Sequence, residues 1–194
     1  MKKSILLLIL SFLSSSALCQ VSIGIRDTQY AQLGYRFNNT CSIGIEHSLY
    51  SDHIDYQKIR LLFGYSFSKD YFKVRVSPYV STLWGGEYHD YGCYVINELW
   101  LLELLGLDFT VNTHYDSQLG FMFCTYAGFA WQICKDFSLL LHYSSIPEFR
   151  MKEYRLRAGI KLAMGELWVK PEISLPLTGQ IKSCRVLCSF GYCF

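Results

Sequence analysis

The chain has 194 residues, of which 51% are hydrophobic, 16% are aromatic and only 18% are charged. A sequence this apolar buries enough surface to offset its ordering entropy, which excludes an intrinsically disordered protein. With 18 basic against 16 acidic residues, it also lacks the clustered basic excess of a nucleic-acid-binding protein. Two classes remain: an unusually apolar soluble domain, or a membrane protein whose apolar residues are not gathered into helices.

Residues 1–19 have the pattern of a secretory signal peptide. Two lysines are followed by a short apolar run and then by small residues up to Cys19, after which we predict the cut. The run is shorter than the roughly 20 residues that a membrane-spanning helix needs. A lipoprotein signal acylated on Cys19 is the alternative, although Leu18 is bulkier than the small residue expected before it. The predicted mature domain is therefore 20–194.

Cleavage changes the charge balance and limits how the chain can cross a membrane. The two lysines of the signal account for the formal charge of +2, and the remaining 175 residues carry 16 basic and 16 acidic side chains. They contain no second apolar stretch of spanning length, since the best, 99–107, is interrupted by Glu103. A mature chain that spans a membrane must therefore do so with strands.

From Val21 onward, apolar side chains alternate with polar, small or glycine residues. The odd positions of one such stretch are Ile59, Leu61, Phe63, Tyr65 and Phe67. A period of two is typical of β-strands and not of helices.

Turn signals separate the alternating stretches. Tight turns alternate along the chain with longer, more polar connections. The tight turns are predicted at Asn38-Asn39-Thr40, Lys69-Asp70, Cys134-Lys135-Asp136 and Met164-Gly165. The longer connections are predicted at 51–55, 84–92, 113–118, 145–153 and 176–182. This organisation predicts an all-β, antiparallel transmembrane β-barrel with an even number of strands. Twelve strands result if the chain also breaks at 26–28 and 103–106, and ten or eight remain open.

The last strand carries the most specific pattern. Its last alternate positions are all aromatic: Phe190, Tyr192 and the terminal Phe194. This resembles the closing strand of bacterial outer-membrane β-barrels, and the resemblance implies that the barrel-assembly machinery reads these residues as its signal. A lipocalin-like secreted barrel is the soluble competitor, because alternation alone does not tell the inner face from the outer one.

The polar face of the predicted strands is rich in basic residues. Its basic members are Arg36, Lys58, Arg60, Lys73, Arg75, Arg155, Arg157, Lys161, Lys170 and Arg185. Its acidic members are Glu46, Asp108 and Glu172, and most other acids fall in the connections, Asp90 and Asp116 among them. A surplus of about seven positive charges cannot lie in a dry interior. We therefore expect a hydrated basic lumen that favours small anionic solutes; the alternative is that these side chains pair with inward-folded loop acids or face outer solvent.

Seven cysteines remain after cleavage, an odd number that leaves at least one free thiol or an intermolecular bond. Cys124 and Cys193 fall on the polar face and could pair if their strands are neighbours. No CxxC pair or Cys/His cluster has metal-ligand spacing, so we expect no metal and no cofactor.

One short motif suggests chemistry. His142-Tyr143-Ser144 places an imidazole and a hydroxyl on one strand face, close to Glu148 and Glu153. This resembles the His-x-Ser of outer-membrane lipid A deacylases, which implies His142 as general base, Ser144 as nucleophile and Glu148 or Glu153 as the orienting group. The chain departs from that family in having Ser145 after the motif, where the family has Asn, and in the fifty residues that follow Ser144.

The sequence as a whole predicts one integral outer-membrane barrel of a Gram-negative bacterium, in contact with outer-membrane lipid and lipopolysaccharide. Its leading role is structural or pore-forming. A lipid A deacylase-like hydrolase is the second class, and an adhesion or complex-forming barrel is the third, although the modest loops offer little surface for it.

Overall fold

The computed structural model describes residues 20–49, 57–101, 104–148, 151–178 and 184–194, so the predicted signal peptide lies outside the described residues. The described chain forms strands throughout. They are β1 (Gln20–Arg26), β2 (Tyr30–Arg36), β3 (Cys41–Ser48), β4 (Lys58–Lys69), β5 (Phe72–Leu83), β6 (His89–Leu101), β7 (Leu105–Asp116), β8 (Gly120–Cys134), β9 (Phe137–Glu148), β10 (Met151–Met164), β11 (Leu167–Thr178) and β12 (Arg185–Cys193). No described segment forms a helix long and apolar enough to cross a membrane.

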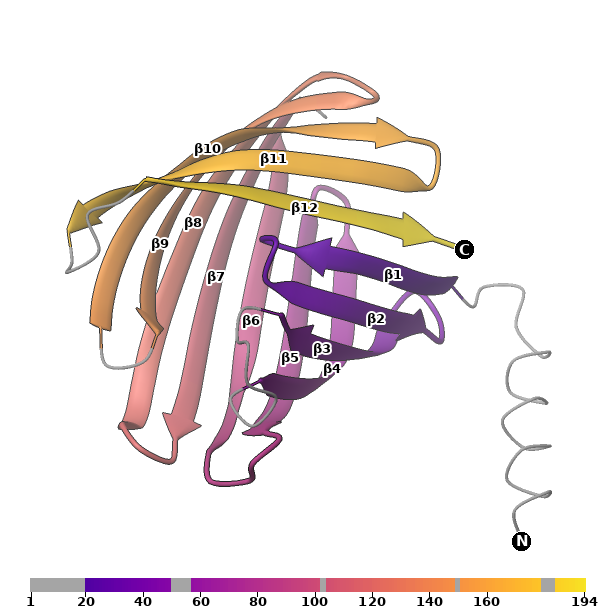
Figure 1. Ribbon diagram of the computed structural model, residues 1–194. Coiled ribbons are helices and arrows are strands. Elements are labelled where there is room, and N and C mark those ends of the chain that lie inside the picture. Colours follow the sequence, from indigo (N-terminus) through magenta and orange to yellow (C-terminus); the bar gives the residue numbers. More distant parts are fainter. Residues whose placement is uncertain (1–19, 50–56, 102–103, 149–150, 179–183) are drawn as a thin grey trace, which may run out of the picture.

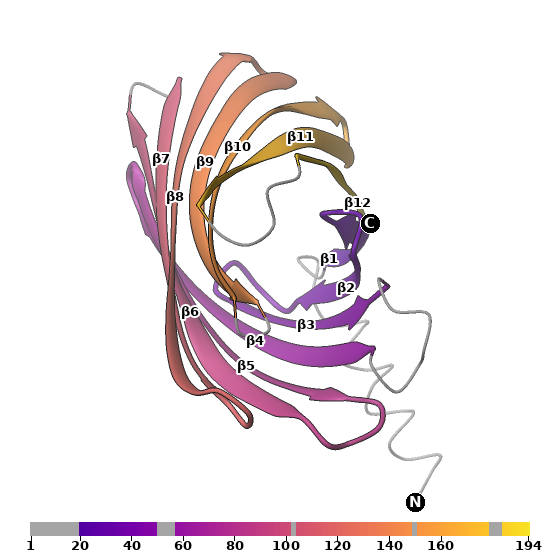
Figure 2. The same cartoon turned by 60° about the vertical axis from the view of Figure 1, so that its left-hand side comes forward.

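The strands close into a single antiparallel barrel. Each strand pairs with its sequence neighbour, and β12 pairs with β1 through a register that sets Ile23 opposite Tyr192. Figures 1 and 2 show the sheet curling until its first and last strands lie side by side. The predicted fold and its twelve strands are confirmed. Both weakly marked breaks exist, because β1 ends at Arg26 and β6 ends at Leu101.

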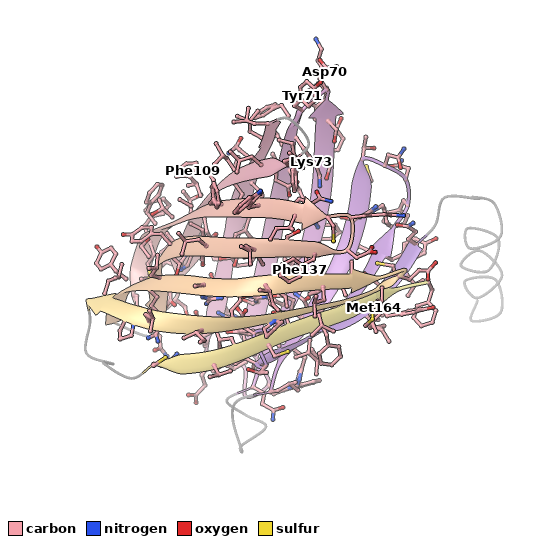
Figure 3. All side chains as sticks on the ribbon, turned by 90° about the horizontal axis from the view of Figure 1, so that it is seen from above. Asp70, Tyr71, Lys73, Phe109, Phe137 and Met164 are labelled. Carbon is pink, nitrogen blue, oxygen red and sulfur yellow. The ribbon has the colours of Figure 1, made fainter. Side chains whose placement is uncertain are left out.

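The four predicted tight turns all lie at the barrel end that bears the termini. They join β2 to β3, β4 to β5, β8 to β9 and β10 to β11. Figure 3 labels Asp70 and Tyr71 at the tip of one of them. At the opposite end, three of the predicted longer connections are shorter than expected. The end of 84–92 belongs to β6 and the start of 113–118 belongs to β7. Most of 145–153 belongs to β9 and β10. Asp90 and Asp116 belong to strands, and their side chains have partners inside the barrel, Lys58 and Tyr88.

The outer face is apolar and the buried positions are polar. Large hydrophobic side chains point outward along the strands, for example Leu33, Phe63, Phe109 and Val186, the last with 76% of its surface exposed. Figure 3 shows the side chains on the ribbon and labels Phe109 and Met164 among the outward ones. The buried side chains are mostly Ser, Asp, Glu, Asn and Lys. A soluble lipocalin-like barrel has the opposite arrangement, with apolar residues inside and polar residues outside. An apolar outer face around a polar interior matches a barrel surrounded by lipid.

One side of the barrel is built from short strands. β1 and β2 have 7 residues each, β3 has 8 and β12 has 9, whereas β4 to β11 have 12 to 15. The wall formed by β12, β1, β2 and β3 is called the short wall below. Figure 1 shows it beside the longer β4 to β8.

The turn between β1 and β2 bends toward the interior. Asp27 and Thr28 both adopt left-handed backbone conformations, with φ of 56° and 58°. The turn is held against β12, because the Thr28 amide donates to the Cys188 carbonyl at 2.8 Å and the Asp27 amide donates to Ser189 Oγ at 2.8 Å. Asp27 is thereby buried on the inner side of the barrel.

The described cysteines form no disulfide with one another. Cys124 lies on β8 and Cys193 on β12, and these strands are not neighbours in the barrel. A disulfide between Cys124 and Cys193 required neighbouring strands, and this requirement is not met.

Candidate functional site

The interior of the barrel contains a cavity of about 1030 Å³. Its lining comes from strands all around the barrel, including β1 to β5 on one side and β9 to β12 on the other. The polar positions of the alternating pattern supply most of it, since a period of two sends every second side chain inward.

Most of the predicted basic residues line this cavity. They are Arg36, Arg60, Lys73, Arg75, Arg155, Arg157, Lys170 and Arg185. Lys58 is buried on the inner face outside the lining, and Lys161 is exposed at a position of β10 that shares the face of Arg157. The sequence reasoning missed Arg26, which also lines the cavity. Its even position in 20–26 marks it for the inner face, whereas the predicted break at 26–28 places it in a turn.

The basic surplus of the cavity is five, smaller than the seven expected. Nine basic side chains line it against the acids Asp27, Glu46, Asp108 and Glu172. Asp90 and Asp116, which the sequence placed in connections, belong to β6 and β7 and are buried. Inward-facing acids therefore neutralise more of the basic face than their local sequence indicates.

Glu46 is the centre of one charged cluster. Its carboxylate accepts from Arg26 Nη2 at 3.1 Å, from Arg60 Nη1 at 3.3 Å and from Gln32 Nε2 at 2.5 Å. The guanidinium of Arg60 also lies over the ring of Tyr79, 4.5 Å from its centroid. Because these contacts combine ion pairing, hydrogen bonding and cation–π stacking, they fix Arg60 against the wall.

A second cluster buries Lys58 away from the cavity lining. Lys58 Nζ lies 2.8 Å from Asp90 Oδ2 and donates to the Tyr88 hydroxyl at 3.2 Å. The Tyr88 hydroxyl in turn donates to Asp116 Oδ2 at 2.6 Å. Burial and the hydrogen bond to Asp116 raise the pKa of Tyr88, which stays a protonated donor. Lys58 is therefore compensated by acids and adds nothing to the charge of the cavity.

Arg36 and Arg75 have neutral hydrogen-bond partners. Arg36 Nη1 donates to Gln20 Oε1 at 3.3 Å, and Arg75 donates to Ser77 Oγ at 3.1 Å and Ser42 Oγ at 3.3 Å. Lys73, by contrast, lies 3.3 Å from the carboxylate of Glu98. Since serine and glutamine oxygens carry no formal charge, they do not neutralise the guanidiniums of Arg36 and Arg75, whose positive charge acts on the cavity.

Asp27 joins the β1–β2 turn to β10, which is separated from β1 by β12 and β11. Arg157 Nη1 donates to Asp27 Oδ2 at 3.0 Å, and Arg26 Nη1 lies 3.6 Å from the same oxygen. Burial opposes ionisation of this carboxyl, but Arg157 and Arg26 outweigh it and hold the pKa of Asp27 below its usual range. The turn is thus anchored by an ionised carboxylate.

His142 lies between two carboxylates. Its Nδ1 is 3.7 Å from Asp108 Oδ2, and its Nε2 is 3.8 Å from Glu172 Oε1. Glu172 is almost fully buried and also lies 3.0 Å from Lys170 Nζ. Asp108 and Glu172 come from β7 and β11, on either side of β9, so this row crosses five neighbouring strands.

The geometry does not assemble the His-x-Ser motif as a hydrolase would. Ser144 is only 1% exposed, and its Oγ has no hydrogen-bond partner among the described residues. The nitrogens of His142 face Asp108 and Glu172 instead. Both motif side chains line the inner cavity, away from the lipid-facing surface on which a lipid A substrate would lie. The side chains of Glu148 and Glu153 are outside the described ones.

The C-terminal aromatic residues lie on the outer face. Phe190, Tyr192 and Phe194 are all exposed, and the rings of Tyr192 and Phe194 meet edge to face at 4.7 Å. Within the described ranges, no group of three or more His, Cys, Asp or Glu side chains is placed to hold a metal ion.

Comparison with known proteins finds similar folds and no similar sequences. No family model matches the chain, and no curated protein does. Among solved structures, a KdgM porin in complex with disordered oligogalacturonate has a TM-score of 0.67 at 9% identity, over 91% of this chain and 98% of that one. A NanC porin gives 0.55 at 11% identity, over 90% and 97%. An outer membrane channel from Pseudomonas putida F1 gives 0.62 at 7% identity, over 93% and 97%.

These similarities define the class of fold. The chain is a closed twelve-stranded antiparallel barrel with the architecture of outer-membrane channels. At identities of 7 to 11%, the likeness concerns the fold.

Proposed function

We propose that this protein is an outer-membrane pore whose hydrated lumen favours small anionic solutes. The observation that carries the proposal is the basic surplus of the cavity, nine basic against four acidic side chains. Uncompensated charges in a dry protein interior cost several kcal/mol each, so water or anions must reach them. A ring of basic side chains lowers the energy of an anion in transit and raises that of a cation.

The proposed location is the outer membrane of a Gram-negative bacterium. An apolar outer wall around a polar interior is stable only when lipid covers the outside. Residues 1–19 would export the chain, and the aromatic strand ending in Phe194 would be read by the barrel-assembly machinery. The exposed outer wall would then contact outer-membrane lipid and lipopolysaccharide.

Arg36 and Arg75 are the residues best placed to set the selectivity. They line the cavity and are hydrogen-bonded to neutral oxygens, and neither forms an ion pair with a carboxylate among the described residues. Gly64 makes room for one of them, since a Cβ there would lie 2.8 Å from Arg75 Nη2. One of the similar porins holds an oligogalacturonate, a polyanion that fits the same preference.

Purified protein in planar bilayers tests the proposal directly. Under a potassium chloride gradient, we expect single-channel conductance and a reversal potential of the sign given by faster chloride passage. Galacturonate in place of chloride tests whether an organic anion also carries current. Absence of channels, or a preference for potassium, would contradict the proposed function.

Paired variants locate the selectivity. Replacing both Arg36→Gln and Arg75→Gln should lower the chloride-to-potassium permeability ratio roughly fivefold, because each lost charge changes the relative energy of the two ions by about 0.5 kcal/mol at these separations. Lys135→Gln is the matched control, since this lysine is exposed in the β8–β9 turn and lines no part of the cavity. An unchanged ratio in the double variant would remove these arginines from the selectivity mechanism.

A further inference from the structure

The row formed by Asp108, His142 and Glu172 combines features that nothing in the pore function requires. An imidazole lies between two carboxylates, at 3.7 and 3.8 Å from its two ring nitrogens. These separations allow ion pairing but are too long for hydrogen bonds. His142 Nε2 and Glu172 Oε1 are buried without a hydrogen-bond partner among the described residues, whereas Glu172 Oε2 lies 3.0 Å from Lys170 Nζ. The row is therefore unsatisfied as it stands.

Protonation of the imidazole would satisfy both sides of the row. A neutral imidazole has one N–H and one lone pair, so one of the two carboxylates must face an acceptor. An imidazolium has two N–H donors, and each would point at a carboxylate. With both carboxylates ionised, only the protonated imidazole is thus complementary to Asp108 and Glu172 together.

Two glycines on the strands between these residues leave the space that the row needs. Gly128 on β8 lies between the strands that carry Asp108 and His142, and a Cβ there would come within 2.5 Å of His142 Nδ1. Gly159 on β10 does the same for the other side, since a Cβ there would lie 2.6 Å from Glu172 Cγ. Two glycines on the two intervening strands therefore let three side chains on alternate strands approach one another.

The charged surroundings of His142 come from every strand near it. They are Glu98 on β6, Asp108 on β7, Arg157 on β10, and Lys170 and Glu172 on β11, while β8 presents Gly128 and Tyr126. Arg157 is occupied by Asp27 at 3.0 Å, and Lys170 by Glu172 at 3.0 Å. The two carboxylates nearest the imidazole are therefore the groups that respond to its charge.

We infer that the Asp108–His142–Glu172 row is a proton-binding site that makes the anion selectivity of the pore depend on pH. The inference rests on the proposed function, because its readout is the passage of ions. Histidine is the side chain whose ordinary titration falls between about pH 5 and 8. His142 lines the cavity, so its proton adds one charge to the existing surplus. It also draws Glu172 toward the imidazolium and leaves the ammonium of Lys170 more available to a passing anion.

Selectivity measured against pH tests the inference. Between pH 8 and pH 5, the chloride-to-potassium permeability ratio of the wild-type protein should rise about twofold, the effect of one partly screened charge on a passing ion. His142→Gln should remove the rise, and His142→Arg should give the acid-state ratio at both pH values. His47→Gln is the control, because His47 faces outward and accepts from Trp84 Nε1 at 3.0 Å. Gly128→Ala keeps every ionisable group but separates the row, and should move the rise to lower pH.

The outcomes separate the inference from the function on which it rests. A channel that prefers anions but shows the same ratio at pH 8 and pH 5, or a rise that survives in His142→Gln, would overturn the proton-binding site and leave the pore intact. Absence of channels would overturn the proposed function itself. An NMR titration of the His142 ring in the detergent-solubilised barrel then still tests the row, since Asp108→Asn should lower the midpoint of His142 and not that of His47.

Discussion

Glu46 shows how a charged side chain is kept inside this barrel. It is 7% exposed, and Arg26, Arg60 and Gln32 supply donors to its two oxygens. An isolated carboxylate at this place would be costly, so the cluster is stable because each charge has a partner. The same rule explains why the inner wall tolerates many charged residues while only some of them remain available to solutes.

Removing one member of this cluster should destabilise the barrel. Glu46→Gln leaves Arg26 and Arg60 without the carboxylate that lies between them, and we expect a loss of about 3 kcal/mol in the free energy of unfolding. Urea unfolding of the protein in lipid vesicles measures it. Glu166→Gln, in the exposed β10–β11 turn, is the control and should change the unfolding midpoint little. Equal midpoints for Glu46→Gln and wild type would contradict the structural role given to the cluster.

Asp27 makes the stability of the β1–β2 turn depend on acid. Its pKa is lower in the folded protein than in the unfolded chain, so the ionised carboxylate stabilises the fold above the unfolded value near 3.8. That contribution is lost as the pH falls through the lower folded pKa. We expect Asp27→Asn to be less stable than wild type at pH 7 and to lose less stability below pH 4. Unfolding midpoints of both proteins at pH 7 and pH 3 compare the two, and parallel curves would argue against the ion pair with Arg157.

At the scale of elements, the β1–β2 turn adopts a backbone conformation that its residues disfavour. A turn with two left-handed central residues normally carries glycine or asparagine, yet this one has Asp27 and the β-branched Thr28. Contacts with Cys188 and Ser189 of β12 hold it in place. The absence of a glycine is also why the sequence marks this break weakly.

Relief of that strain should be measurable. Thr28→Gly removes the Cβ that disfavours the left-handed conformation and should raise the free energy of unfolding by about 1 kcal/mol. Thr28→Ala retains a Cβ and should give no such gain. Urea midpoints in vesicles compare the two variants, and a gain for alanine equal to that for glycine would show that side-chain contacts of Thr28, and not its backbone, set the difference.

The connections between the strands show where reasoning from local sequence succeeds and where it fails. The sequence predicts tight turns such as Lys69-Asp70 and Met164-Gly165 correctly, because their turn chemistry is local. It predicts longer connections at 84–92 and 113–118, yet Asp90 and Asp116 lie in strands. Their partners Lys58 and Tyr88 come from elsewhere in the chain, and no local pattern reveals that pairing.

At the scale of the whole molecule, the short wall would set how the barrel fits a bilayer in the proposed outer-membrane location. Seven residues extend about 23 Å along a strand, or about 18 Å across the membrane at a tilt near 40°. The apolar band of an outer-membrane barrel is about 25 Å tall. The short wall therefore favours a thinner bilayer beside β1, β2 and β3 than beside β4 to β8.

Bilayer thickness should accordingly control folding. We expect a higher folded fraction in vesicles of 12-carbon lipids than in 18-carbon lipids, because the thinner bilayer removes the mismatch at the short wall. Heat-modifiable migration on a gel measures the folded fraction. Lengthening β1 and β2 by two apolar–polar residue pairs each should narrow the difference between the two lipids. Equal folding of the wild-type protein in both lipids would contradict this account.

The sequence by itself determined the class of structure: strands with one apolar face, short turns alternating with longer connections, and a basic polar face. Those properties are local or repeat along the chain, so they can be read from spacing. Only the tertiary structure decided which charges are compensated, since Asp27 meets Arg157 and Lys58 meets Asp90 across long separations in sequence. It also decided that His142 faces Asp108 and Glu172 and not Ser144. Strand pairing and barrel closure bring these residues together, and the charge that remains uncompensated in the cavity depends on those distant contacts.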